Sequence, residues 1–70
     1  MKLKINGESQ TIKIPEDPKN VSNLLKQLNY HPQLIVLEFN GTILPPEDWD
    51  KQLIKNGDCF EIVTIVGGGS

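Results

Sequence analysis

This 70-residue sequence contains no arginine, one cysteine and one histidine. With seven scattered lysines and a formal net charge of −2, it lacks the clustered basic face with which proteins bind nucleic acid. Cys59 cannot form an internal disulfide, and with only His31 to accompany it the chain offers no plausible metal cluster. We therefore expect no metal, no bound cofactor and no nucleic-acid partner.

Long hydrophobic runs are also missing. No apolar stretch approaches the roughly 18 residues that a membrane-spanning helix needs. The N-terminus alternates charged and apolar residues where a secretory signal would have an apolar block. We expect a cytoplasmic protein with no membrane partner, and one domain near the lower size limit for folding on a single hydrophobic core.

The first half of the chain predicts a β-hairpin followed by a helix. Asn6-Gly7 suits a tight turn, and apolar residues alternate on both sides of it, in residues 2–6 and 10–14: Leu3, Ile5, Ile12 and Ile14. Asn20 is the expected N-cap of an amphipathic helix, whose apolar stripe is Val21, Leu24, Leu25 and Leu28. A helix this short is marginal alone, so it must pack on a sheet.

The second half predicts three strands and one helical turn. Residues 34–40 form the most apolar strand, expected to be central, and residues 42–44 a short strand after the Asn40-Gly41 turn. Residues 47–53 resemble a helical turn, and residues 59–66 form the last strand. The side chains expected to face the core are Ile35, Leu37, Phe39, Trp49, Leu53, Phe60 and Ile62.

This order predicts an α+β fold with a mixed four- to five-stranded sheet and one helix packed across it. The domain covers residues 1–66, and residues 67–70 are expected to be a flexible glycine-rich tail. If the last strand lies beside the first and parallel to it, the tail projects freely. A terminal glycine run taken alone is usually a frayed end, but it also forms a thin thread that can enter a narrow cleft.

The residues and their order resemble the ThiS family, the ubiquitin-like β-grasp sulfur carriers of thiazole biosynthesis. The resemblance covers essentially the whole chain. It rests on the ββαββ order, residues 21–25 and 37–45, Trp49, Gly57-Asp58 and the terminal glycines. Pro46 departs from the pattern, because the family often has a basic residue after this proline.

The resemblance implies a carrier and not an enzyme. In this family an E1-like adenylyltransferase uses ATP and magnesium to adenylate the terminal glycine carboxylate. Sulfur delivered through a cysteine desulfurase then displaces AMP to give a thiocarboxylate, from which thiazole synthase takes the sulfur. Matching to the family places the terminal pair on Gly68 and Gly69 and leaves Ser70 as an additional residue. Ser70 is either removed, tolerated by the cognate enzyme, or an appended residue.

Three other functions stay open at this point: the small subunit of molybdopterin synthase, a ubiquitin-like protein modifier, and a passive interaction domain with an inert tail. The partner-binding candidates lie on the sheet face opposite the helix or lead into the tail. They are Val36, Val63, Ile65, Val66 and Gly67. A cluster of aliphatic residues on that face suits a partner, unless a loop covers it.

The remaining candidates favour structural roles. Cys59 is expected to be a small strand residue, His31 a solvated loop residue, and Trp49 a cover for the open end of the core. The acidic group Glu47, Asp48 and Asp50 lacks the spacing of a calcium loop.

Overall fold

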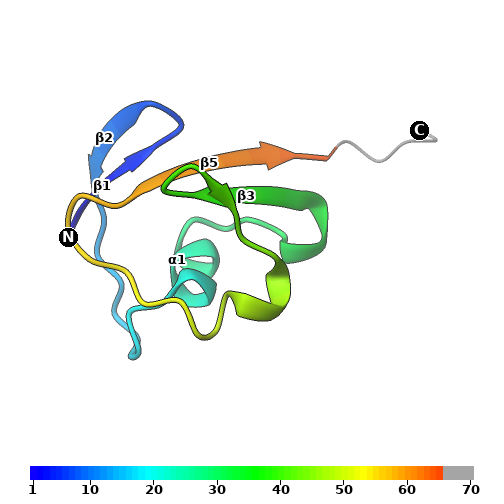
Figure 1. Cartoon of the computed structure of the whole chain (residues 1–70). Coiled ribbons are helices and arrows are strands. Elements are labelled where there is room, and N and C mark those ends of the chain that lie inside the picture. The colour runs from blue at the N-terminus through cyan, green and yellow to red at the C-terminus, as the bar shows by residue number, and fades with distance from the viewer. Residues whose placement is uncertain (66–70) are drawn as a thin grey trace.

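A single helix lies under one face of a five-stranded sheet in the computed structural model, which describes residues 1–65 (Figure 1). The α+β arrangement predicted from the sequence is therefore confirmed. In chain order the elements are β1 (Lys2–Ile5), β2 (Glu8–Thr11), α1 (Val21–Gln27), the 3-10 turn η1 (Pro32–Leu34), β3 (Ile35–Phe39), β4 (Thr42–Ile43), the 3-10 turn η2 (Pro46–Asp48) and β5 (Cys59–Thr64).

The strand order across the sheet is β2-β1-β5-β3-β4. β5 runs parallel to β1 and antiparallel to β3, so the last strand along the chain occupies the middle of the sheet. The sequence pattern predicted β3 to be central. β3 is an interior strand, paired with β5 on one side and β4 on the other, but the middle position belongs to β5. The parallel pairing of the first and last strands agrees with the arrangement considered from the sequence.

The first hairpin turns at Asn6 and Gly7, whose φ angles are 51° and 85°. Both residue types tolerate this left-handed region better than others. β2 is shorter than predicted and ends at Thr11, although the amide of Ile12 still donates to the carbonyl of Met1 at 2.8 Å. Ile12 and Ile14 are buried as expected, so the core contacts of this segment persist after its strand pairing stops.

Asn20 caps α1 as predicted. Its Oδ1 accepts from the amide of Asn23 at 2.9 Å, and its Nδ2 donates to the carbonyl of Asp50 at 3.0 Å. The buried side chains of the helix are Val21, Leu24 and Leu25. The helix ends at Gln27, shortly before Asn29 takes a φ of 62°. One buried asparagine therefore both starts the helix and ties it to the segment after η2.

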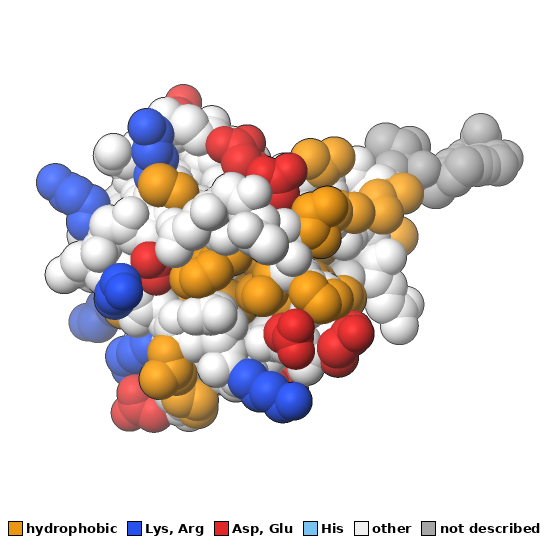
Figure 2. Space-filling model, in the orientation of Figure 1, with side chains coloured by type: hydrophobic (Ala, Val, Ile, Leu, Met, Phe, Trp, Pro, Cys, Tyr) orange, Lys and Arg blue, Asp and Glu red, His pale blue; other side chains and the backbone are white. Residues whose placement is uncertain are grey.

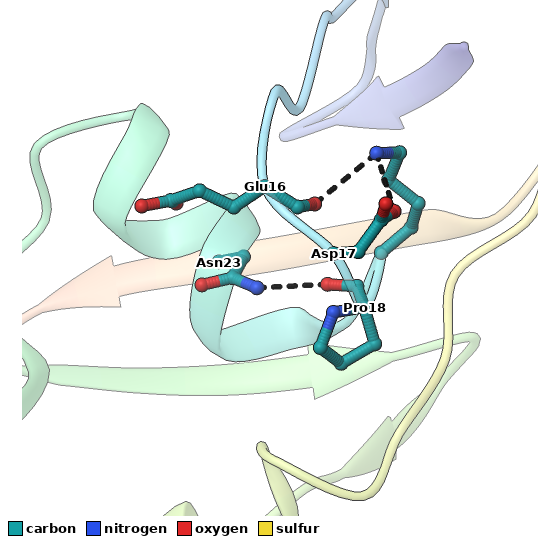
Figure 3. A network of polar contacts seen from close by, with 5 residues as sticks. Glu16, Asp17, Pro18 and Asn23 are labelled. Atoms are coloured by element: carbon teal, nitrogen blue, oxygen red, sulfur yellow. Dashed lines mark hydrogen bonds and ion pairs between the residues drawn. The ribbon is translucent and has the colours of Figure 1, made fainter.

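The loop before α1 is held by polar contacts near its surface (Figure 3). The ammonium of Lys19 lies 2.7 Å from a carboxylate oxygen of Asp17 and 3.2 Å from the carbonyl of Glu16. Asn23 donates to the carbonyl of Pro18 at 2.8 Å, and the Asp17-Pro18 peptide bond is cis. These contacts lead the chain into the first turn of the helix.

The core lies between α1 and the sheet and includes residues from the segment that follows η2. Phe39 and Phe60 meet with ring centroids 5.3 Å apart and planes tilted by 58°. The buried hydrophobic residues are Leu3, Ile5, Ile12, Ile14, Val21, Leu24, Leu25, Ile35, Leu37, Trp49, Ile54, Phe60 and Ile62. Among the described residues, no buried side-chain nitrogen or oxygen lacks a hydrogen-bond partner.

The prediction that Leu53 faces inward is wrong. Leu53 is 61% exposed, and its neighbour Ile54 is buried instead. The helical period fails because the turn ends at Lys51. Leu53 then forms an isolated β-bridge with Asn20, and the amide of Ile54 donates to the carbonyl of Lys19. Trp49 is buried as expected, and its Nε1 donates to the carbonyl of Leu44 at 2.8 Å.

No helix in residues 1–65 is both long enough and apolar enough to cross a membrane.

Candidate functional site

The face of the sheet that points away from α1 has no helix over it (Figure 1). We call it the open face. Along β5, Phe60 and Ile62 point into the core, while Cys59, Glu61 and Val63 are exposed on the other side. This alternation is the period of a strand, so the open face follows directly from the register of the core residues.

Exposed aliphatic side chains gather at one end of the open face. Val36 of β3 pairs with Val63 of β5, the amide of Ile65 donates to the carbonyl of Leu34, and Ile43 of β4 lies beyond Glu38. We call these five residues the apolar patch. Their exposed fractions are Leu34 43%, Val36 39%, Ile43 62%, Val63 62% and Ile65 49%. Contiguous exposed aliphatics of this kind mark interaction surfaces.

The structure brings together three of the predicted partner-binding residues, Val36, Val63 and Ile65. No loop of residues 1–65 buries them, so the alternative in which a loop covers this cluster does not hold for the described chain. Leu34 and Ile43 join the cluster through the register, which the sequence pattern did not indicate. The other predicted site residues, Val66, Gly67, Gly68, Gly69 and Ser70, lie outside the described residues.

A polar network holds the start of β5. The buried carboxylate of Asp58 accepts from the amide of Lys55 at 2.9 Å and from Nδ2 of Asn40 at 3.2 Å. Asn40 in turn accepts from the amide of Cys59 at 2.8 Å. From the sequence, Asn40-Gly41 was expected only as a turn, and Gly57-Asp58 contributed only to the family resemblance. Both turns share this network, which fixes the β3-β4 hairpin against the first residue of β5.

The rest of β5 is anchored along its length. Asn6 Oδ1 accepts from the amide of Ile62 at 2.7 Å, and the amide of Ile65 donates to the carbonyl of Leu34 at 2.6 Å. Backbone pairing with β3 connects these points. Val63 and Ile65 therefore lie on a segment that is hydrogen-bonded to its neighbours up to the last described residue.

The other candidates show no arrangement for catalysis. Cys59 is exposed, and its Sγ lies 3.8 Å from the carbonyl of Gly57. His31 caps η1, where its Nδ1 accepts from the amide of Gln33 at 3.3 Å. Trp49 is buried, as expected for a residue that covers the core. Within residues 1–65, no group of three His, Cys, Asp or Glu side chains could hold a metal ion.

A family model described as the ThiS family matches residues 3–69. The chain belongs to the ThiS family. The match includes the strands, the helix and the glycine run, and it stops one residue before Ser70.

Solved structures of the ThiS family agree with this fold. The crystal structure of the thiamine biosynthesis protein ThiS from Geobacter metallireducens is 33% identical, with a TM-score of 0.80, and the alignment covers 99% of this chain and all of that one. An NMR structure of a thiamine biosynthesis protein from the same organism has the same TM-score and 34% identity, over 100% of this chain and 90% of that one. The predicted β-grasp fold is therefore confirmed.

Curated relatives of this ThiS-family chain include the ycf40 proteins of Trieres chinensis and Porphyra purpurea. The first is 46% identical over 71% of this chain and 68% of the relative, and the second is 36% identical over 96% and 90%. A protein named thiazole synthase from Paramagnetospirillum magneticum is 34% identical over the whole of this chain. The chain spans only 21% of that relative's length.

Proposed function

We propose that this chain is a sulfur carrier of thiamine biosynthesis whose chemistry takes place on the carboxylate that ends its glycine run. Membership of the ThiS family and the ThiS structures from Geobacter metallireducens support the carrier role. The observation that carries the proposal is the family match from residue 3 to residue 69, because it includes both the scaffold and the glycines.

The carboxylate is the reactive group. A carboxylate is a poor electrophile until one of its oxygens becomes a good leaving group. An E1-like adenylyltransferase that holds ATP and magnesium supplies that activation by forming the acyl-adenylate. The outer sulfur of a persulfide, formed on the desulfurase from cysteine, attacks the acyl carbon and AMP leaves, which gives an acyl disulfide. A thiol reductant then breaks the S–S bond of that acyl disulfide and releases the thiocarboxylate. The carrier contributes no catalytic group, and ATP and magnesium belong to the partner.

Glycines suit the approach to such an active site. They carry no side chain to obstruct a narrow channel, and a partner can bind the backbone N–H and C=O groups of an extended peptide. Gly68 and Gly69 are the proposed sulfur-carrying end, with Gly69 as the reacting residue once Ser70 has been removed. The end of the family match at residue 69 supports this assignment.

Docking of the folded domain uses the apolar patch. The patch lies at the end of β5 that precedes the glycines, so a partner that contacts Val63 and Ile65 also receives the residues that follow them. Covering exposed aliphatic surface stabilises a complex by roughly 25 cal/mol per Å² of apolar area before the costs of association. The same patch serves the adenylating enzyme and thiazole synthase in turn.

Thiazole synthase is the proposed sulfur acceptor. A protein of that name contains a segment similar to the whole of this chain, which favours the thiazole pathway over the molybdopterin pathway. In a pull-down, retention of thiazole synthase supports this acceptor. Retention of the large molybdopterin synthase subunit instead would reject it.

Intact-mass measurement tests the chemistry. Three versions of the chain are incubated with the purified cognate adenylating enzyme, ATP, magnesium, a desulfurase with cysteine, and a dithiol reductant: the full chain, a chain that ends at Gly69, and a chain that ends at Gly67. We expect the version ending at Gly69 to gain AMP and then to exchange one oxygen for sulfur, and the shortest version to remain unmodified. If none of the three gains AMP or sulfur, the proposed function is wrong.

A further inference from the structure

Two carboxylates face each other across the middle of the open face. Glu38 of β3 and Glu61 of β5 are direct partners in the antiparallel register. Side chains at such positions have Cβ atoms about 4.5–5.5 Å apart, and like charges directly opposite each other destabilise a sheet. Glu61 is exposed and Glu38 is half-buried. The fold therefore contains an unfavourable pair at a position where many polar residues would be more stable.

No cation in the described chain forms an ion pair with either carboxylate. The ion pairs within residues 1–65 are Lys19–Asp17 and Lys26–Glu16, and both involve the loop that precedes α1. Lys4 of β1 shares the open face, but its register partner is Cys59, one row away from Glu61 along β5. Glu38 and Glu61 thus present two carboxylates without an ion-pair partner from residues 1–65.

The pair borders the apolar patch. Ile43 lies opposite Glu38 on its other side, and the next row along β3 and β5 is Val36 with Val63. Figure 2 shows acidic side chains next to hydrophobic ones along the side of the molecule that faces away from α1. A partner that covers the patch must therefore also cover or closely approach the two carboxylates.

Covering two carboxylates without a compensating charge is strongly unfavourable, because the charges lose their hydration. The partner must therefore supply a cation at this point. An arginine fits the geometry best, because its planar guanidinium carries five donors and can bond to two carboxylates at once, whereas a lysine acts as a compact point charge. The adenylating enzyme is the partner with the strongest reason to be positive here, since it must bring an anionic carrier up to the phosphates of ATP.

We propose that Glu38 and Glu61 recognise one arginine on the docking surface of the adenylating enzyme, seated between them at the border of the apolar patch. This inference rests on the proposed function and specifies its partner. It predicts that neutralising the pair weakens the complex without destabilising the free domain. A purely structural role for the two glutamates would move stability and binding in the same direction.

The test compares the wild type with Glu38→Gln, Glu61→Gln and the double variant. Thermal unfolding is followed by circular dichroism. The KM for the carrier is measured in ATP–pyrophosphate exchange with the purified cognate adenylating enzyme at several salt concentrations. The double variant should raise KM by about tenfold, leave kcat within about twofold and weaken the salt dependence of KM. Its Tm should be equal to or about 2 °C above that of the wild type.

Glu8→Gln is the matched control. Glu8 is an exposed residue of β2 that pairs with the core residue Ile5, so it lies in the sheet but not beside the patch. It should leave KM unchanged. A double variant with wild-type KM, or one that loses Tm together with affinity, overturns the inference. Weakened binding to thiazole synthase but not to the adenylating enzyme also overturns it.

The experiment distinguishes a failure of the proposed function from a failure of this inference. If the wild type, with or without Ser70, supports no exchange, the carrier role is wrong and the inference falls with it. If the wild type is active and the glutamine variants behave like it, only the inference is wrong.

Discussion

The two faces of the sheet differ in solvent exposure and in composition, although the same strands build both. On the face that α1 covers, which we call the covered face, Phe60 and Ile62 are almost inaccessible to solvent. Glu61 and Val63 of the same strand are exposed on the open face. Full burial of an aliphatic or aromatic side chain contributes about 1.5–3 kcal/mol. The covered face therefore accounts for stability, while the open face carries exposed aliphatics and a like-charged pair that stability does not require.

The largest effect on stability should come from the covered face. Phe60→Ala removes a fully buried ring that packs against Phe39. We expect the free energy of unfolding to fall by about 3–5 kcal/mol, which is a large part of the stability of a small domain. Urea denaturation followed by circular dichroism measures the change.

Cys59→Ser is the control for Phe60→Ala on the neighbouring residue of the open face. It should change the free energy of unfolding by no more than about 0.5 kcal/mol. If both variants lost a comparable free energy of unfolding, the conclusion that the covered face accounts for stability would be wrong.

Asp58 stabilises the start of β5, and this strand contributes side chains to both faces of the sheet. Asp58→Ala leaves the amides that its carboxylate accepts from, those of Lys55 and the Asn40 side chain, without this partner. We expect a loss of about 2 kcal/mol in the free energy of unfolding. Asp17→Ala, which removes an exposed ion pair with Lys19, should cost less than about 1 kcal/mol. Equal losses in urea denaturation would show that the network contributes nothing.

Asn20 supports the covered face through the helix. Asn20→Ala removes the N-cap and the contact with the carbonyl of Asp50, and should cost about 1–2 kcal/mol. Asn23→Ala removes only an exposed bond to the carbonyl of Pro18 and should cost less. At a temperature where Asn20→Ala is fully folded, its KM in the exchange assay should match the wild type. A raised KM there would mean that the helix cap affects the open face.

The smallest effect on stability should come from the apolar patch. Val63→Ser should change the free energy of unfolding by less than about 0.5 kcal/mol, because the side chain is already exposed. It should nevertheless raise the KM of the adenylating enzyme for the carrier by about fivefold or more. Thr11→Ala, an exposed change at the β2 edge, should leave KM unaltered. Unchanged kinetics for Val63→Ser would exclude Val63 from the interface.

Local signals predicted much of the fold. Asn20 was identifiable as a cap because a side-chain acceptor precedes an apolar 3.6-residue period, and Asn6-Gly7 because both residues tolerate positive φ. Leu53 and Ile54 could not be assigned in the same way. Their orientation depends on where η2 ends, and a pairing with the distant residues Asn20 and Lys19 decides that.

The composition of the open face could be predicted only in part from the sequence. Val36, Val63 and Ile65 were identified by strand alternation, but whether they meet and remain exposed depends on the pairing of β3 with β5. The opposition of Glu38 and Glu61, and the network of Asn40 with Asp58, depend on the same register. A register is set by contacts between segments far apart in the chain, so no local pattern reports it.

The position of β5 also affects which chains can compete for a partner. β5 follows the other described strands in the sequence but lies between β1 and β3, and its pairing with β1 closes a long loop at an entropic cost. A fragment that stops before Cys59 would contain two separate hairpins, with no strand to join them. The apolar patch and the carboxylate pair each need residues of or just after β5. Incomplete translation products and N-terminal proteolytic fragments therefore cannot display the open face or occupy the partner of the finished carrier.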